Sequence, residues 1–201
     1  MKIEPDNIYC GDCLELMREM PDKSVDFAFA DPWYGIGKTE KDVHYSSGFE
    51  PELIRIARGF AITPGQENIG LCIDNLGVSY KGIVSAWNIN GMTFSKVGFE
   101  NWIPVVTGGN FRRNQNCFRF VVKGIKPDHP SPKPIEFMTE LLLRYTNEND
   151  LILDPFLGSG TTAIAAIRTN RRYIGFEIDP NYYAIAQKRI NAEMAQLKLN
   201  I

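Results

Sequence analysis

The hydrophobic positions of this 201-residue chain fall into two kinds of pattern. Short, continuous apolar runs at residues 25–30 and 151–153 are typical of strands, and the first suits a central parallel strand buried on both faces of a sheet. Apolar residues elsewhere recur at helical spacing, as in residues 13–20 and 135–145. This mixture predicts an α/β fold in which helices cover both faces of a mostly parallel sheet.

The remaining elements are predicted from the same periodicities and from turn residues. We expect strands at 7–12, 59–63, 83–89, 102–107 and 172–177, and helices at 51–58, about 159–169, and from 180 to near the C-terminus. Trp87 and Trp102 are interpreted as core in preference to pocket wall. The length fits one domain, residues 1–201, with a small insertion at about 107–128.

Residues 151–162, Leu-Ile-Leu-Asp-Pro-Phe-Leu-Gly-Ser-Gly-Thr-Thr, have the order strand, glycine turn, helix. Gly158 and Gly160 permit a sharp turn and a close ligand, and the start of the helix directs N–H groups toward that ligand. The strand at 172–177 ends in Glu177, where a carboxylate can accept both hydroxyls of a ribose. This third of the chain predicts half of a nucleoside-cofactor site.

The glycine motif by itself leaves the cofactor open. A P-loop would need a lysine after Gly160, but Thr161 and Thr162 follow it. Ala163 satisfies the last position of a nicotinamide fingerprint, so an NAD-linked oxidoreductase remains an alternative.

A second apolar strand, 25–30, ends in Asp31-Pro32-Trp33-Tyr34, and His129-Pro-Ser-Pro-Lys-Pro134 precedes the cofactor strand. Ligands of open α/β sheets bind beyond the carboxyl ends of strands, so Asp31 and Asp154 are expected to share one site. This constellation resembles the amino-methylating DNA methyltransferases, with the catalytic motif first as in their β-class. The resemblance covers residues 6–191, and Trp33 replaces the usual second proline of the catalytic motif.

The resemblance implies a Rossmann-like methyltransferase fold with a seven-stranded sheet and a circularly permuted motif order. It implies transfer of a methyl group from S-adenosylmethionine to adenine N6 or cytosine N4 of a base flipped out of double-stranded DNA. The catalytic residues are then Asp31, Pro32, Trp33 and Tyr34, with the Asp31 carboxylate and the Pro32 carbonyl accepting the N–H groups of the amine. The expected cofactor-binding residues are Asp12, Lys133, Asp154, Phe156, Gly158, Gly160, Thr161, Thr162, Glu177 and Ile178.

Two of these assignments depend on the resemblance alone. The family places a Gly-Asp beside the adenine of the cofactor, which assigns Asp12, although a solvated turn acid explains Asp12 equally well. Lys133, just before the cofactor strand, is expected near the methionine carboxylate of the cofactor.

The net charge of the chain is −2, yet residues 107–128 carry five Lys or Arg and one acid, a local charge of +4. Basic side chains on a polar segment fit contacts to phosphate, so Arg112, Arg113 and Arg119, with Lys38 in the loop at 36–48, are the predicted DNA-binding residues. Loop solvation explains the same charge without a partner. A domain for recognising the DNA sequence must be small or absent. The recognised sequence is therefore short, or a second copy in a homodimer supplies the selectivity.

Composition excludes several other classes. No apolar run is long enough to span a membrane and no signal core is present, so a cytoplasmic protein is expected. Cys10 and Cys13 resemble half a zinc site, but no second close pair exists and no metal is predicted. The absence of a Pro-Cys pair disfavours a cytosine-C5 methylase.

The base that accepts the methyl group is predicted to be adenine. In the resembled family, Asp at the head of the catalytic motif is commoner among adenine-N6 members, and Ser among cytosine-N4 members. Trp33 can instead narrow the slot to the size of a pyrimidine, which would favour cytosine N4. The other alternative is an inactive S-adenosylmethionine-binding module with Trp33 as the lesion.

Overall fold

The computed structural model describes residues 2–34, 46–89, 93–95, 98–110, 115–122 and 133–199, with the backbone alone at 93–95, 98–100 and 198–199. Eight of the described strands form one sheet in the order β1-β10-β9-β2-β3-β7-β4-β8. Their bounds are β1 (Asn7–Cys10), β2 (Val25–Ala30), β3 (Ala57–Ile62), β4 (Tyr80–Asn88), β7 (Trp102–Gly109), β8 (Cys117–Phe120), β9 (Leu151–Asp154) and β10 (Arg172–Glu177). Strands β5 (Thr93–Ser95) and β6 (Gly98–Glu100) form a separate antiparallel pair.

The sheet is mostly parallel, as predicted. Strands β1, β10, β9, β2 and β3 run in one direction, β7 is antiparallel to both β3 and β4, and β8 is parallel to β4. Strand β2 carries the catalytic motif and lies directly beside β9 of the cofactor motif, with Phe27 opposite Ile152. The catalytic strand therefore precedes its spatial neighbour by more than a hundred residues, which is the permuted order that the motifs predicted.

The prediction of seven strands was wrong, because β8 adds an eighth at the edge. Its residues lie in the segment that the sequence indicated to be a polar, basic loop. Phe118 and Phe120 are buried, whereas Cys117 and Arg119 are exposed, so only alternate residues of this short strand face the core. An alternation of apolar and polar residues over only four positions is too short to predict a strand within a segment that is otherwise polar.

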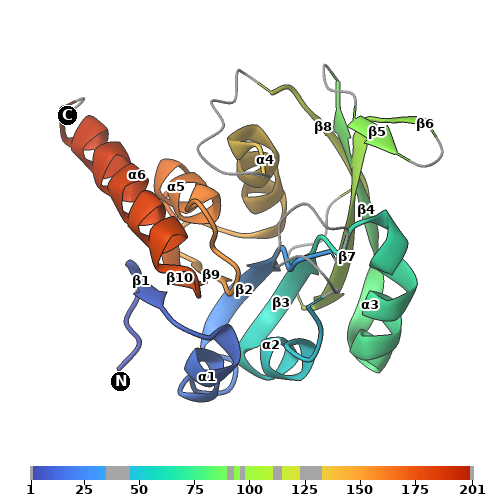
Figure 1. The fold of residues 1–201 in the computed structure, drawn as a ribbon, viewed down its shortest axis with the longest axis horizontal. Coiled ribbons are helices and arrows are strands. Elements are labelled where there is room, and N and C mark those ends of the chain that lie inside the picture. Colours follow the sequence, from blue (N-terminus) through green and yellow to red (C-terminus); the bar gives the residue numbers. More distant parts are fainter. Residues whose placement is uncertain are drawn as a thin grey trace.

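Of the α-helices that the structure describes, three cover each face of the sheet (Figure 1). Helices α1 (Cys13–Arg18), α2 (Glu50–Ile56) and α3 (Ile69–Leu76) pack on one face, and α4 (Ile135–Tyr145), α5 (Thr161–Arg168) and α6 (Pro180–Leu199) on the other. Each face has its own core, which contains Leu53 and Phe60 on the α1–α3 side and Phe137 and Leu141 on the α4–α6 side. Helix α3 has no counterpart among the predicted elements.

The prediction that Trp87 lies in the core was also wrong, since 47% of its surface is exposed. Ile62, the last residue of β3, is level with Val106 and Ile83, whereas Trp87 pairs with Trp102 four residues further along β4. Strands β4 and β7 thus extend past the end of β3, by roughly 13 Å at the rise of a strand. Trp87 lies on this extension, and its side chain is therefore exposed instead of buried in the core.

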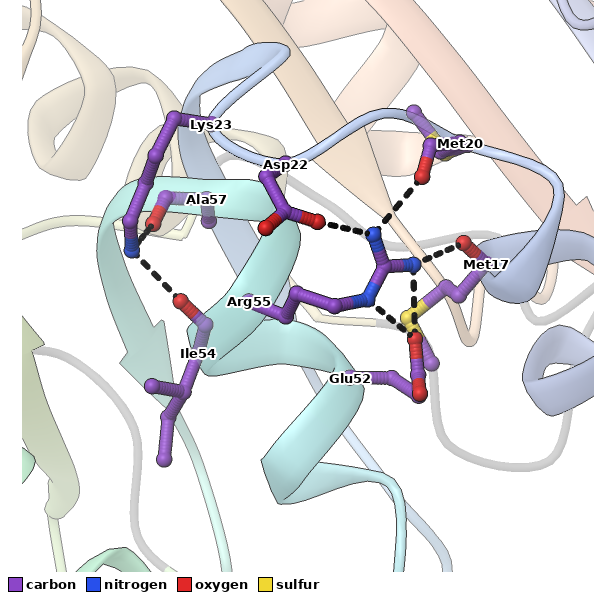
Figure 2. A network of polar contacts seen from close by, with 8 residues as sticks. All are labelled: Met17, Met20, Asp22, Lys23, Glu52, Ile54, Arg55 and Ala57. Carbon is purple, nitrogen blue, oxygen red and sulfur yellow. Dashed lines mark hydrogen bonds and ion pairs between the residues drawn. The ribbon is translucent and has the colours of Figure 1, made fainter.

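At the amino edge of the sheet, α1 and α2 bind each other's ends (Figure 2). The guanidinium of Arg55 in α2 donates to the carbonyls of Met17 and Met20, both at 2.8 Å, and to the Asp22 carboxylate at 2.6 Å. Lys23, in the turn after α1, donates to the carbonyls of Ile54 at 2.6 Å and of Ala57 at 2.8 Å. These charged donors bind carbonyls at the ends of the two helices, where intrahelical N–H partners are few, and the Met17 carbonyl also accepts from the Met20 N–H at 3.0 Å.

Two features are absent from the described residues. None of their helices is long and apolar enough to cross a membrane, and no group of three or more His, Cys, Asp or Glu side chains among them is arranged to hold a metal ion. The assignment of residues 1–201 to one domain, with an insertion at about 107–128, stays a prediction.

Candidate active site

Four acids line the carboxyl edge of the sheet in the order of the strands. Asp12 follows β1, Glu177 ends β10, Asp154 ends β9 and Asp31 follows β2. Because these four strands are adjacent and parallel, their carboxyl ends form one continuous edge. The predicted meeting of Asp31 and Asp154 at this edge is confirmed.

The Asp31 carboxylate is held by three side chains. Oδ1 accepts hydrogen bonds from the Thr63 hydroxyl at 2.6 Å, the Tyr34 hydroxyl at 2.7 Å and the Lys133 ammonium at 2.7 Å. Lys133 Nζ also donates to Oδ2 at 2.7 Å and to the Tyr34 hydroxyl at 2.8 Å. Asp31 and Lys133 thus form a largely buried ion pair within the catalytic motif.

Burial and charge decide the protonation of this cluster. Burial raises the pKa of the Tyr34 hydroxyl well above its ordinary value, and the negative charge of Asp31 raises it further. Burial lowers the pKa of Lys133, but the attraction of Asp31 and Tyr34 outweighs burial and leaves that pKa raised. Tyr34 therefore stays neutral and Lys133 stays charged near neutral pH, so a permanent cation contacts the carboxylate.

The backbone of the catalytic motif is fixed by the turn that follows β3. The Asn68 side chain donates to the carbonyls of Tyr34 and Pro64, both at 3.0 Å. Gly65 has a φ of +74°, and a Cβ there would lie 3.0 Å from the Tyr34 ring, so only glycine fits without strain. Pro32 is buried, whereas the Trp33 side chain is 40% exposed.

Asp154 and Glu177 each accept hydrogen bonds from the turn after β9. Asp154 accepts from the Phe156 N–H at 2.9 Å and from the Thr162 hydroxyl, while Glu177 accepts from the N–H groups of Gly158 and Asp179, both at 2.8 Å. Burial raises the pKa of Asp154 to about 7 against the opposing effect of its hydrogen bonds. Burial likewise raises the pKa of Glu177.

The glycine turn rests on helix α6. Gly158 and Gly160 have φ values of +54° and +86°, and α5 begins after them at Thr161, two residues later than predicted. A Cβ on Gly160 would lie 3.2 Å from Ala186 of α6, so this glycine permits helix packing as well as a sharp turn. Arg189 of α6 donates to the Ser159 carbonyl at 2.6 Å and to its hydroxyl at 2.7 Å.

The remaining predicted cofactor residues are placed as follows. Asp12 caps α1 by accepting from the Leu14 N–H at 2.7 Å, and its role beside the cofactor stays a prediction. Phe156 packs edge-on against Phe49 with ring centroids 4.9 Å apart, and Ile178 is exposed beyond Glu177. Thr161 is buried at the start of α5. Lys133 contacts the catalytic carboxylate, and its role toward the cofactor stays a prediction.

Of the predicted DNA-binding residues, Lys38, Arg112 and Arg113 lie outside the described residues. Arg119 is exposed on β8, opposite Trp87 of β4. Both border an open groove of about 660 Å³ that Ile89, Cys117 and Arg144 also line.

Sequence reasoning missed three residues that shape the site. Thr63 holds Asp31, Asn68 holds the Tyr34 backbone and Arg189 holds Ser159. Thr63 carried a usable signal, because a polar residue that ends a predicted parallel strand belongs to the same edge as Asp31. Asn68 and Arg189 gave none, because neither lies in a recognisable motif.

Comparison with known proteins defines the class. Residues 67–188, more than half of the chain, match the model of the DNA methylase family called N6_N4_Mtase. The chain belongs to this family of S-adenosylmethionine-dependent DNA methyltransferases, which confirms the resemblance drawn from the motifs and removes the NAD-linked alternative.

Individual relatives are similar along most of their length. Type II methyltransferase M2.MboI of Moraxella bovis is 26% identical over 96% of this chain and 90% of its own. DNA adenine methyltransferase YhdJ of Escherichia coli (strain K12) is 26% identical over 94% of this chain and 83% of its own.

Two solved structures have the same fold. The complex of M1.HpyAVI with SAM superposes with a TM-score of 0.68 at 22% identity, covering 92% of this chain and 98% of the other. The cytosine-N4-specific PvuII DNA methyltransferase also gives 0.68, at 17% identity, covering 92% and 86%. The Rossmann-like methyltransferase fold predicted from the motifs is confirmed.

Proposed function

We propose that this chain transfers the methyl group of S-adenosylmethionine to N6 of an adenine flipped out of duplex DNA. The observation that carries the proposal is the adjacency of β2 and β9, which puts the Asp31 carboxylate beside the turn that begins at Asp154. A nucleophile held at Asp31 and a methyl donor held at the turn would then meet at the carboxyl edge of the sheet.

The chemistry of this edge fits the proposed cofactor. S-adenosylmethionine supplies an electrophilic methyl group on a sulfonium and also carries a cationic amine. The four acids of the edge suit two positive charges, whereas they would repel the pyrophosphate of a dinucleotide. We assign Glu177 to the ribose hydroxyls, and Asp154 with the start of α5 to the methionine part.

Asp31 acts in this proposal by orienting the amine. The lone pair of an exocyclic amine is delocalised into the ring, so the nitrogen is a weak nucleophile until its N–H groups are held. The Asp31 carboxylate and the Pro32 carbonyl each accept one N–H and turn the lone pair toward the methyl carbon. The lone pair forms the new N–C bond, the C–S pair stays on sulfur, and the nitrogen then loses one proton to water.

The contact with Lys133 fits the orienting role. A charged ammonium 2.7 Å from both oxygens holds the Asp31 carboxylate in place, where it serves as a hydrogen-bond acceptor. Orientation of two reactants contributes up to ~7–11 kcal/mol in favourable systems, so the reaction needs no covalent intermediate. Flipping the base costs a few kcal/mol, and stacking on Tyr34 is proposed to offset part of that cost.

Adenine is favoured over cytosine by the Asp at the head of the motif and by the aromatic surface beside it. Trp33 is 40% exposed, so it does not belong to the core and offers area on which a purine stacks better than a pyrimidine. Cytosine N4 is the second candidate, because the indole of Trp33 in place of a proline narrows the space for the flipped base. The relatives include names of both kinds, an adenine methyltransferase and a cytosine-N4-specific one.

The test is nucleoside analysis of DNA from cells that express the chain. We expect N6-methyladenine by mass spectrometry, and none from cells that express the Asp31→Ala variant. Purified Asp31→Ala should still bind S-adenosylmethionine in calorimetry, since Asp31 contacts the amine. Finding N4-methylcytosine alone would reassign the base, and cofactor binding with neither product would favour the inactive module.

A further inference from the structure

The two oxygens of the Asp31 carboxylate differ in their hydrogen bonding. Oδ1 accepts from Thr63, Tyr34 and Lys133, at 2.6, 2.7 and 2.7 Å. Among the residues whose positions the structure gives, Oδ2 accepts from Lys133 alone, at 2.7 Å. A carboxylate oxygen has two lone pairs, so three donors saturate Oδ1 and leave Oδ2 able to accept one more.

Lys133 does not create this difference, because its ammonium lies 2.7 Å from each oxygen. The two hydroxyls that bind only Oδ1 create it. Tyr34 is three residues from Asp31 on the same loop, so its hydroxyl is a local contact of the carboxylate. Thr63 comes from the end of β3 and therefore fixes the carboxylate relative to the sheet.

Thr63 is itself held rigidly in the sheet, so it can fix the orientation of the Asp31 carboxylate. It is fully buried, and its backbone N–H donates to the carbonyl of Ala30, the residue before Asp31, at 2.9 Å. Its backbone and its side chain thus bind two consecutive residues at the end of β2. Pro64 and Gly65 follow Thr63 in the turn against which the Tyr34 ring packs.

We propose that Thr63 is a positioning residue for methyl transfer and that Asp31 Oδ2 is the atom that accepts the N–H of the target amine. This inference rests on the proposed function. Thr63 occupies Oδ1 and sets the rotation of the carboxylate about its Cβ–Cγ bond, so that Oδ2 faces the amine. Loss of the hydroxyl removes one of the three donors that hold Oδ1, loosens this rotation and misaligns the lone pair, without changing any group assigned to the cofactor.

The test compares Thr63→Val, which keeps the shape and removes the donor, with Thr63→Ser, which keeps the donor. Single-turnover transfer of labelled methyl groups from S-adenosylmethionine to mixed-sequence duplex DNA is measured with saturating cofactor. We expect Thr63→Val to lower the transfer rate roughly 10- to 100-fold, as for the loss of a hydrogen bond to a charged group. The dissociation constant for S-adenosylmethionine should change less than about twofold, and Thr63→Ser should restore most of the rate.

Thr107→Val is the matched control, since Thr107 is also a buried threonine and its hydroxyl donates to the Gly82 carbonyl at 3.0 Å, on the neighbouring strands β7 and β4. It should leave the transfer rate unchanged. Equal rates in Thr63→Val and wild type, or equal losses in the Val and Ser variants, would overturn the positioning role. If Thr63→Val does not fold, Thr63→Ala replaces it in the same comparison. A wild-type chain that methylates no DNA would instead overturn the proposed function.

Discussion

At the scale of single residues, the Asp154 carboxylate of the candidate active site lowers the stability of the fold. Its carboxylate is buried at the end of β9, and burial raises its pKa to about 7. The folded state therefore binds more protons than the unfolded state between about pH 4 and pH 7, so this residue lowers the free energy of unfolding as the pH rises through that window. A cationic cofactor favours the ionised form, so the same burial that weakens the fold prepares a site for positive charge.

Asp154→Asn should remove this dependence. An amide stays neutral, can still accept from the Phe156 N–H and can donate to the Thr162 hydroxyl. We expect the stability of the variant relative to wild type to increase as the pH rises from about 4 to about 7, by up to roughly 4 kcal/mol, and the variant to bind S-adenosylmethionine more weakly. Urea unfolding at several pH values measures the gain, and parallel pH profiles of the two proteins would contradict it.

At the scale of elements, two devices hold helices to the sheet at opposite edges. Arg189 and Ala186 of α6 support the glycine turn at the carboxyl edge, where the function is proposed. Arg55 and Lys23 tie the ends of α1 and α2 at the amino edge, where they stabilise the fold (Figure 2). The amino edge therefore contributes to stability and the carboxyl edge to the proposed function. A substitution at the amino edge should leave cofactor binding at the carboxyl edge unchanged.

Arg55→Met should lower the free energy of unfolding by about 1.5–3 kcal/mol, because it removes charged hydrogen bonds to two carbonyls and to the carboxylates of Asp22 and Glu52. The melting temperature should fall by roughly 3–10 °C. Arg58→Met is the control, since Arg58 is exposed and its ion pair with Asp26 spans 3.8 Å. It should cost less than about 0.5 kcal/mol. Cofactor affinity of folded Arg55→Met should match wild type, and a clear loss would show that the edges are coupled.

At the scale of the whole molecule, the extension of β4, β7 and β8 beyond the end of β3 places Trp87 and Arg119 past the level of the proposed active site. The exposed guanidinium and indole border one open groove. A basic and aromatic surface in this position agrees with the predicted contact between Arg119 and DNA, which stays a prediction, as does the homodimer.

Arg119→Ala should reduce the salt dependence of DNA binding. If Arg119 neutralises one phosphate, the slope of log K against log salt should decrease in magnitude by about 0.9. Arg18→Ala is the control, because Arg18 is exposed at the far end of α1, near the amino edge. Fluorescence anisotropy with a labelled duplex between about 50 and 200 mM salt measures both slopes. An unchanged slope in Arg119→Ala would assign this residue to ordinary surface solvation.

The sequence by itself determined the features that local chemistry specifies. Asp31, Asp154 and Glu177 end apolar strands, and the glycines after β9 need positive φ, so the parallel sheet and the shared edge followed from the chain alone. The local pattern did not predict β8, because four residues are too few to show a clear alternation of apolar and polar side chains. It also did not predict the exposure of Trp87, because that exposure depends on how far β4 extends past the end of β3.

Only the tertiary structure decided which side chains meet at the Asp31 carboxylate. Thr63 comes from a different strand and Lys133 from about a hundred residues away. Thr63 reaches Asp31 because β3 pairs with β2 in a particular register, and Lys133 reaches it from a position just before α4. No local pattern encodes such a contact, because its geometry is the sum of strand pairing, turn shape and helix packing along the intervening chain.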